Sequence, residues 1–444
     1  MSIKKSLYDE LILESNDRSR SVGLIGGAIL FEYFEDVFSP TITAKIKIVD
    51  NGNVIASQDN PDGDKQSIYN GLPIRGGERL SLKIAGNSST NPGLDFSKRV
   101  EDYFYVSSIT DVISETNRES FTLHLVSREA ITNETSRVGK KFKVDNRISD
   151  SVEDILKDYL KTNKVGKIDK SSNKYGFIGN LRKPFTILVW LASKGVPEKS
   201  GSATAGFLFY QTQDGFQFRS IDDLLDQSPK ATYTYTQSQE SYGENDKKLN
   251  NDFKILNYYV EKNQNLIEKL RLGTYASHRM FFNPLDFSFS KEADGKFRQS
   301  DYVGKTNNLG SDIKLPPLSE GSDLTLGDVP TRIITAVYDV GTLDPATSTD
   351  INSDQREYQS QSLMRYNILF TQTLSIIVPS NTNLRAGDII ECLFPKITQS
   401  NAKEYDTETS GLYMIKELCH HFDVNRSYTS MKLIRDTFGI NKKA

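Results

Sequence analysis

The sequence predicts a mainly β, multi-domain protein that also contains α+β modules. In several short runs apolar residues alternate with polar ones, which is typical of strands with one buried face. From about residue 140 the period changes, and the apolar residues of two segments follow the helical period instead. Tyr (21) and Phe (23) are abundant, and aromatic side chains beside Thr, Val and Ile favour strands. A chain of 444 residues exceeds one ordinary core, so we expect about two to four domains.

The clearest strand pattern lies near the N-terminus. Ile42, Ala44, Ile46 and Ile48 alternate with Thr and Lys residues, and an Asp-Asn-Gly sequence at 50–52 then turns the chain. Similar runs follow at 80–84, 103–113 and 120–128, and a polar turn joins the last two. We therefore expect an antiparallel sheet that is closed by a hairpin.

Two segments have the helical period. The apolar residues of 152–160 fall on one helix face, and Asp150 with Glu153 predicts a capping box at the start. A second helix is expected over 183–195, with Pro184 in its first turn. Strand, turn, strand and short-helix patterns follow, so this part reads as a small α+β module.

These patterns divide the chain into five parts. The part from about 292 to 355 is rich in Gly, Pro, Ser, Asp and Asn around one apolar strand, RIITAVYDV, which is typical of a surface insertion. The predicted parts are 1–137, a first β domain; 138–245, the α+β module; 246–291, the first strands of a second β domain; 292–355, the insertion; and 356–444, a helix and the remaining strands of the second β domain.

The two β-rich parts repeat the same order of motifs. IRGGERLSLKI, YFYVSSITDVI and SFTLHLVSRE in the first part match LRAGDIIECLF, LYMIKELCHHF and SYTSMKLIRD in the second. Gly77 and Gly387 occupy the same place, and Thr122 and Thr429 each precede an Arg by six residues. The apolar phase slips by one residue in the last motif, which leaves a bulge or a misalignment open. Duplication and convergent hairpin chemistry both fit this pattern.

Composition excludes several classes of protein. The formal net charge of −3 gives no basic field for nucleic acid. Two cysteines make no disulfide framework, so we expect folding in a reducing cytoplasm. The first residues lack a signal-peptide pattern, and the apolar run FTILVWLA is far shorter than the roughly 20 residues of a membrane helix.

No motif for nucleotide binding, zinc proteolysis or an activated serine occurs in the sequence. Gly76 and Gly77 precede a strand rather than a helix, which favours a tight turn over a phosphate cradle. Asp222 and Asp223 resemble the paired carboxylates of a glycosidase, but adjacent residues point apart and SIDDLL reads as the capped start of a short helix.

Cys419, His420 and His421 form the one cluster with reactive side chains. On a strand, Cys419 and His421 face one way and His420 faces the other, so only two ligands point together, fewer than zinc requires. Cys392, His124 and His278 have no metal-ligand spacing to this cluster. We therefore predict no catalytic, cofactor-binding or metal-binding residues, and no enzyme activity.

The order of motifs along the chain resembles a known family. The chain is similar to the central baseplate hub proteins of T-even-type contractile-tailed bacteriophages and their marine and cyanophage relatives. The segments that carry the resemblance are ILFEYFEDVFSPTITAKIKIVDNG, LPIRGGERLSL, FYQTQDGFQFRSIDDLL, RMFFNPLDFSFSK, LMRYNILFTQTLSIIVPSNTNLRAGDIIE and GLYMIKELCHHFDVNRSYTSMKLIRD. They span nearly the whole chain, with the least match between 292 and 355.

This resemblance implies a homotrimer whose subunits each contribute two tube-protein-like antiparallel β-barrel domains. Three subunits would then match a sixfold tail tube to a threefold spike and line the DNA-ejection channel. The implied partners are the tail spike, tail tube or tube-initiator proteins, baseplate wedge proteins, the tape measure protein, and passing DNA without sequence-specific contacts. The implied place is the virion tail baseplate, assembled in the host cytoplasm without a membrane anchor. We expect Lys45, Lys47, Ser81 and Lys83 on outer or lumenal faces.

Two other functions are compatible with the sequence. A tail-associated cell-wall hydrolase would need an acid in an apolar cleft, and no lysozyme-like or amidase-like pattern occurs. A glycan- or receptor-binding tail protein would stack exposed Tyr and Phe on sugars.

Overall fold

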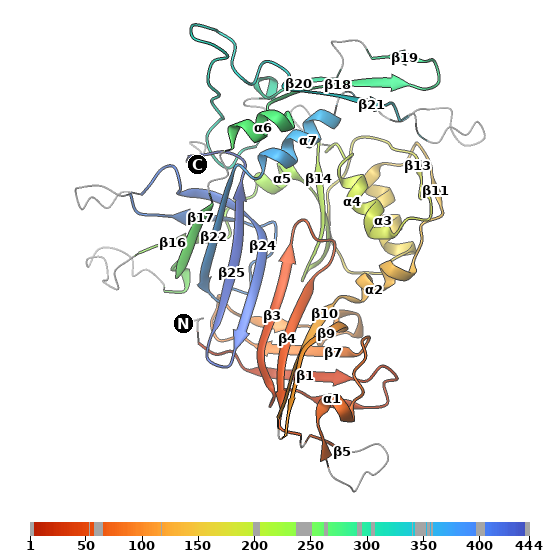
Figure 1. Ribbon diagram of the computed structural model, residues 1–444, viewed down its shortest axis with the longest axis vertical. Coiled ribbons are helices and arrows are strands. Elements are labelled where there is room, and N and C mark those ends of the chain that lie inside the picture. Colours follow the sequence, from red (N-terminus) through yellow and green to blue (C-terminus); the bar gives the residue numbers. More distant parts are fainter. Residues whose placement is uncertain are drawn as a thin grey trace.

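The computed structural model is shown in Figure 1. It describes residues 4–52, 54–56, 65–116, 118–198, 205–236, 251–261, 265–290, 295–302, 307–339, 341, 352, 356, 358–396 and 405–439. Two groups of long strands make up the lower part of the view, the α+β module lies to their right, and a smaller layer lies above. No helix within the described ranges is long and apolar enough to cross a membrane.

Most long strands belong to one large sheet. Its path is β17-β22-β25-β24-β3-β4-β10-β9-β7-β1-β2, with β16, β23 and β8 paired beside this path. The strands are β1 (Tyr8–Glu14), β2 (Ser21–Gly23), β3 (Ala28–Asp36), β4 (Thr43–Asp50), β7 (Arg79–Ala85), β8 (Gly93–Asp95), β9 (Phe104–Glu115), β10 (Arg118–Val126), β16 (Thr232–Thr234), β17 (Asn257–Glu261), β22 (Gln372–Pro379), β23 (Ile389–Leu393), β24 (Gly411–Asp423) and β25 (Ser427–Arg435). The mainly β, multi-domain prediction is confirmed, but the path is open and its described strands form no closed barrel.

The repeat read from the sequence is present in the strand order. The first repeat runs β3-β4-β10-β9-β7 and the second runs β17-β22-β25-β24-β23. All neighbours within each repeat are antiparallel, including the predicted hairpins β9–β10 and β24–β25. The copies join where β24 of the second repeat pairs with β3 of the first. Outside the repeats the match ends, since β1 pairs antiparallel with β7 whereas β16 pairs parallel with β23.

The same tight turn introduces β7 and β23. Gly77 has a φ of 93° and Gly387 a φ of 89°, a backbone conformation that favours glycine. Each donates its N–H to the next strand of its repeat, at 2.7 and 2.8 Å respectively. The acid that follows, Glu78 or Asp388, accepts the N–H of the Arg three residues earlier at 2.8 Å in both turns. The tight-turn prediction for the first glycine pair is confirmed.

A β-bulge lies at the same place in both hairpins. Ser107 is the extra residue in β9, opposite the step from His124 to Leu125 in β10. Lys416 is the extra residue in β24, opposite the step from Lys432 to Leu433 in β25. Counted from these bulges, Leu123 corresponds to Met431, and both are core residues. The equal Thr-to-Arg spacing that starts at Thr122 is therefore one residue out of register, which explains the slipped apolar phase.

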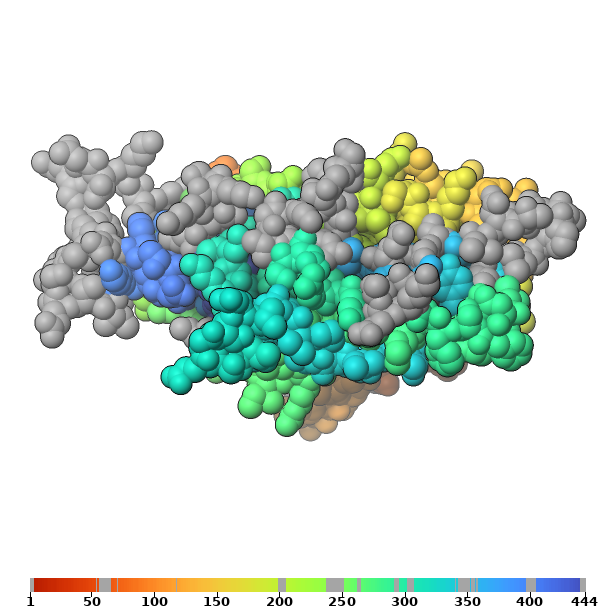
Figure 2. Space-filling model, turned by 90° about the horizontal axis from the view of Figure 1, so that it is seen from above, coloured from red at the N-terminus to blue at the C-terminus, as the bar shows by residue number. Residues whose placement is uncertain are grey.

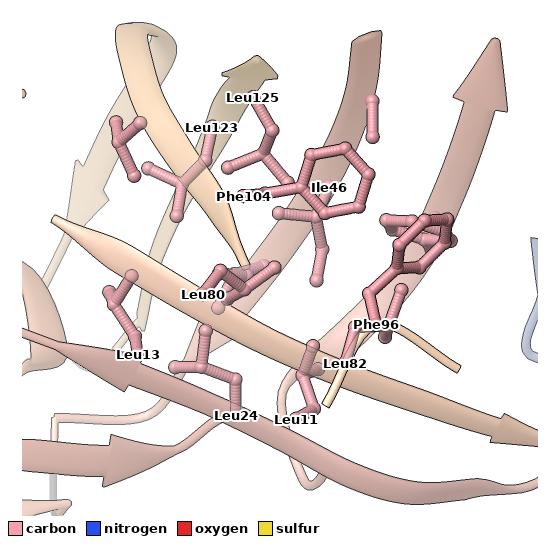
Figure 3. Packing of buried hydrophobic residues seen from close by; sticks show 14 of the residues in the cluster. Leu11, Leu13, Leu24, Ile46, Leu80, Leu82, Phe96, Phe104, Leu123 and Leu125 are labelled. Atoms are coloured by element: carbon pink, nitrogen blue, oxygen red, sulfur yellow. The ribbon is translucent and has the colours of Figure 1, made fainter. Parts of the chain in front are cut away.

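Each repeat has its own apolar core. In Figure 3 side chains from β1, β4, β7, β9 and β10 point into one shared interior, which is the core of the first repeat. Ile42, Ala44, Ile46 and Ile48 are all buried, as their alternation predicts. The second core gathers residues of β16, β22, β23, β24 and β25, among them Tyr233, Leu374, Cys392, Tyr413 and Leu433.

The α+β module packs two helices on a small sheet. Its elements are α2 (Arg128–Thr135), β11 (Lys141–Phe142), α3 (Ile148–Asp158), β12 (Val165–Ile168), β13 (Phe177–Ile178), α4 (Pro184–Ala192), β14 (Phe207–Thr212), β15 (Gly215–Ser220) and α5 (Ile221–Leu225). Both predicted helices are present, with Pro184 at the start of α4. The capping box is wrong: a bridge from Arg147 to Lys174 fixes the start of α3, so Asp150 lies inside its first turn.

A smaller layer lies above the large sheet (Figure 1). It contains α6 (Leu266–Leu272), β18 (Ala276–Asn283), β19 (Ser288–Phe289), β20 (Lys296–Arg298), β21 (Arg332–Val337) and α7 (Gln359–Ile368). The short elements β5 (Ile55–Ala56), β6 (Lys65–Gln66) and α1 (Ile68–Gly71) lie near the bottom of the view. Three 3₁₀ helices, Val100–Asp102, Asn251–Phe253 and Gln299–Tyr302, complete the described elements. The strand and the helix predicted in this region are β21 and α7. β18 was expected in the second β domain, but it pairs parallel with β21 in a separate sheet.

Part of the predicted insertion lies outside the described residues, namely 292–294, 303–306, 340, 342–351 and 353–355, and so does the nearby residue 357.

A buried arginine joins the rest of this layer to the body. Arg365 on α7 is 1% exposed and donates to Asp222 Oδ1 of α5 at 2.5 Å. Its Nη1 lies 3.7 Å from Asp436 Oδ2 after β25, and Asp436 Oδ1 accepts the N–H of Leu309 at 3.0 Å. One cation therefore ties four segments together.

A buried carboxylate lies where both repeats meet the α+β module. Glu35 on β3 accepts the Tyr33 hydroxyl at 2.7 Å, the Gln213 N–H at 2.7 Å and the Ala386 N–H at 2.8 Å. These donors come from the first repeat, the module and the second repeat. Burial raises the pKa of Glu35 although the guanidinium of Arg385 opposes the rise.

Replacing this carboxylate tests the junction. Glu35→Ala leaves three donors without an acceptor, two of them buried, so we expect a loss of about 3–5 kcal/mol in the free energy of unfolding. Glu35→Gln retains one acceptor oxygen and should lose clearly less. Urea unfolding of both variants measures this, and an alanine variant within about 1 kcal/mol of the parent would contradict the assignment.

Candidate interaction face

Cys419, His420 and His421 lie in the middle of β24. Cys419 and His421 are half-buried on the outer face of the sheet, whereas His420 and Phe422 are buried on the inner face. The predicted division of these side chains is confirmed. Among the residues that the structure describes, no group of three or more His, Cys, Asp or Glu side chains could hold a metal ion.

His420 packs at the seam between the repeats, which is the strand pair β24–β3. Its ring stacks on Tyr33 with centroids 6.1 Å apart and an interplanar angle of 6°. Its Nδ1 lies 3.0 Å from Thr429 Oγ1. Burial, with the Arg385 guanidinium adding to it, lowers the pKa of His420 to about 3, so the imidazole is neutral at physiological pH.

The outer face carries a row of polar and aromatic side chains across five strands. Tyr428, His421, Glu32, Lys45 and His124 are successive partners on β25, β24, β3, β4 and β10. The His421 ring stacks on Tyr428 at 4.2 Å, and its Nδ1 lies 3.0 Å from Glu32 Oε1. Lys45 Nζ lies 3.4 Å from Glu32 Oε2. We call these five residues the polar row; it crosses the seam and so belongs to both repeats.

A shallow groove of about 500 Å³ lies next to the polar row, lined mostly by the second repeat but also by Glu32 and Phe34 of β3. Tyr259, Ser375, Cys419 and Lys432 are among its lining residues. Burial, with Glu32 nearby, raises the pKa of the Cys419 thiol to about 12. Since the thiolate is the nucleophilic form, Cys419 is a protonated, unreactive thiol at neutral pH.

The four polar residues expected on outer faces differ in exposure. Lys45 and Lys47 share the outer face with the polar row, and Lys47 is exposed. Lys83 forms an exposed ion pair with Asp9 at 3.3 Å. Ser81 differs from the expectation: it is buried, and Glu10 of the neighbouring strand β1 accepts the Ser81 hydroxyl at 2.5 Å.

The other candidate side chains lie in a helix cap, an ion pair or a buried position. Asp223 donates its N–H to the Ser220 hydroxyl at 3.0 Å, which confirms the predicted cap of α5, and the neighbouring Asp222 binds Arg365. Cys392 is buried in the core of the second repeat, and His278 is buried in β18 of the separate sheet.

Sequence reasoning missed an apolar surface in the upper layer. Leu285, Phe287 and Phe289, around the β18–β19 turn, are well exposed, and Phe287 is 78% exposed. Ile333 and Val337 on the neighbouring β21 are also well exposed. Figure 2 shows that residues of this layer form much of the upper face of the molecule. We call these five residues the apolar tip; the alternation of apolar residues in PLDFSFS is the signal that could have identified it.

The fold is similar to that of two solved tail proteins. The chain is similar to the tail protein from Neisseria meningitidis MC58, with a TM-score of 0.52 at 10% identity over 97% of each chain. It is also similar to the 43 kDa tail protein of prophage MuSo2 from Shewanella oneidensis, with a TM-score of 0.51 at 9% identity over 96% of this chain and 98% of the other. At these identities the likeness concerns the fold.

The sequence is similar to one named hub protein. It is 22% identical over 277 residues to the "Probable baseplate hub protein gp334" of Vibrio phage KVP40. The match covers 61% of this chain and 62% of that relative, so it spans less than two thirds of the relative's length. No family model matches the chain. The resemblance to baseplate hub proteins is confirmed.

The surroundings of His420 predict a pH dependence. The folded chain keeps His420 neutral down to about pH 3, while the unfolded chain binds a proton near the ordinary value of 6.5. Stability that this residue contributes is therefore present above pH 6.5 and is lost as pH falls, by about 1.4 kcal/mol per unit. In urea unfolding, the free energy of unfolding of His420→Gln should therefore fall less steeply than that of the parent between pH 6.5 and pH 5, by about 1.4 kcal/mol per pH unit. Equal slopes for variant and parent would contradict the assignment.

Proposed function

We propose that the protein is a non-enzymatic, structural component of a phage contractile-tail baseplate. In this proposal it is the trimeric central hub, which adapts the sixfold tail tube to the threefold spike and lines the DNA-ejection channel. The observation that carries the proposal is the pair of repeats with one strand order in a single chain. Three copies of such a chain present six similar units, so a threefold ring can match a sixfold one.

The continuous sheet supports a role in forming a channel wall. The seam joins both repeats through main-chain pairing, so each subunit offers one uninterrupted surface. The polar row holds Glu32 and Lys45, one charge of each sign, which gives no strong field of either sign toward a passing polyanion. We assign this face to the lumen, where DNA would pass without sequence-specific contacts.

In this proposal each repeat is the core of one tube-protein-like domain. The domain division keeps 1–137 as one unit and 138–245 as another, apart from β16, which pairs with β23 and goes with the second tube-like unit. The parts 246–291 and 356–444 contribute to that second unit. β18 then goes with the layer formed around 292–355, because its strand partners lie there.

The apolar tip is the surface that we assign to a protein partner at the spike end. Contiguous exposed apolar side chains mark interaction sites on proteins. The resemblance supplies the partners: the tail spike, tail tube or tube-initiator proteins, baseplate wedge proteins and the tape measure protein. The proposed place is the virion tail baseplate, with assembly in the host cytoplasm.

Electron microscopy of the purified protein tests the proposal. We expect a threefold ring with six lobes, either for the protein alone or in complex with its spike. A strictly monomeric chain that binds neither spike nor tube would refute the hub assignment.

Two assays separate the alternatives. Clearing of peptidoglycan in a zymogram would favour a cell-wall hydrolase. Binding to labelled cell envelopes would favour a glycan- or receptor-binding protein, since a hub at the centre of the baseplate has no access to cell surfaces.

A further inference from the structure

A small pocket lies between the α+β module and the upper layer. One wall comes from the C-terminal end of α4, and the other comes from α7 and β18 (Figure 1). The Ser362 hydroxyl on α7 donates to the Ser193 carbonyl oxygen after α4 at 2.9 Å, which joins the two walls. The volume of about 270 Å³ is just below the roughly 300–1,000 Å³ of pockets for drug-sized ligands, so the space suits a small molecule or a single amino-acid residue.

Helical spacing gathers the lining side chains of each wall. On α7, Gln359, Leu363 and Tyr366 are spaced by four and then three residues, which places them on one face of the helix. On the other wall, Trp190 lies one turn before Lys194, which follows the end of α4. The side chains of Trp190, Leu363 and Tyr366 make much of the lining apolar.

The charged donors of the pocket are Lys194 and Arg279, and no carboxylate is among the described residues that line it. The hydroxyl groups of the lining already donate to main-chain carbonyl oxygens, namely those of Ser193, Ser362 and Tyr366 to the oxygens of Trp190, Ser193 and Phe207. A ligand that accepts hydrogen bonds therefore has the two cations as its main partners.

Arg279 on β18 is incompletely paired. Its Nη1 donates to Gln359 Oε1 at 2.8 Å, but its Nε is buried without a hydrogen-bond partner in the part of the chain that the structure describes. Burial lowers the pKa of Arg279, and the guanidinium of Arg332 lowers it further. A half-buried charge without a counterion costs free energy, which a bound anion would recover.

Lys194 is the second cation. Its Nζ lies 5.0 Å from the ring centroids of both Tyr175 and Trp190, and 3.9 Å from Asp339 Oδ2. Asp339 also accepts the Tyr175 hydroxyl, so this carboxylate is shared. Burial lowers the pKa of Lys194 against the opposing effect of Asp339, and the Arg279 guanidinium lowers it further. The two cations therefore repel each other, and Asp339 balances them only in part.

We propose that this pocket binds a small carboxylate that is attached to an apolar group. The carboxylate lies against Lys194 and Arg279, since charge-assisted hydrogen bonds to carboxylates are strong. The apolar group lies against the rings of Trp190 and Tyr366. Inorganic phosphate has no apolar surface to bury there, so the lining favours the organic acid. Two sources carry this chemistry, a free acid and the C-terminal residue of another chain. The inference goes beyond the proposed function and does not depend on it.

Trp190 makes binding directly measurable, because it is the only tryptophan of the chain. Titration of the full-length protein with 3-phenylpropionate should change the tryptophan fluorescence until it saturates. 3-Phenylpropionamide carries the same ring without a charge, and inorganic phosphate carries a charge without an apolar group, so each should bind at least about tenfold more weakly. Equal binding of the amide or of phosphate would overturn the proposed ligand class.

Variants assign the binding to the two cations. Arg279→Met and Lys194→Met should each weaken 3-phenylpropionate binding at least about tenfold. Because the charge of Arg279 is incompletely paired, Arg279→Met should melt at or above the temperature of the parent, whereas loss of a purely structural arginine would lower it. Arg298→Met, which removes a guanidinium paired with Asp301 in the same layer, should bind like the parent. Unchanged binding in both pocket variants would overturn the site.

A peptide separates the two sources. Acetyl-Gly-Gly-Phe with a free C-terminus carries a similar ring and carboxylate at the end of a chain. Binding within about tenfold of 3-phenylpropionate would support a chain terminus as the ligand, and binding of the free acid alone would support a small molecule. If neither binds, the inference is overturned and the hub proposal stands, because electron microscopy reads ring formation separately.

Discussion

The pairing of β24 with β3 is the interaction on which the rest of the structure depends. Seven residue pairs, from Glu417–Asp36 to Asp423–Leu30, join strands at opposite ends of the chain. The entropy of closing so long a loop rises only slowly with length, so the distance in sequence adds little cost. This seam merges the two repeats into one sheet and carries Phe422 into the first core. It also places the Glu35 carboxylate beside donors from the two other parts.

The individual strands, helices and hairpins were predictable because they depend on short sequence patterns. The alternation from Ile42 to Ile48, the helices α3 and α4, both hairpins and the repeat all depend on neighbouring residues or on equal spacing. The seam depends on which distant strand is available, and no period encodes that choice. The same reason explains why β18 joined β21 rather than the large sheet, and why the expected closed barrels appear as an open path.

The candidate interaction face likewise has features that were predictable from the sequence and features that were not. Strand parity alone separates Cys419 and His421 from His420. The neutral state of His420 depends on Tyr33 and Arg385, which come from segments far away in sequence, so burial of that ring was not predictable. The apolar tip went unrecognised because alternating aromatics normally indicate a buried strand face, and only the fold shows that its side chains are exposed among the residues that the structure describes.

The Arg365 cluster gives the molecule a mechanical connection. The guanidinium holds α7 of the upper layer to α5 of the module and to the segment that follows β25. β25 continues without interruption to the hairpin beside the seam. A push on the upper layer therefore has a stiff route through one desolvated ion cluster and a single strand into the sheet that both repeats share. The Arg365 cluster is therefore one point through which the upper layer, the module and the last strand hold their places relative to one another.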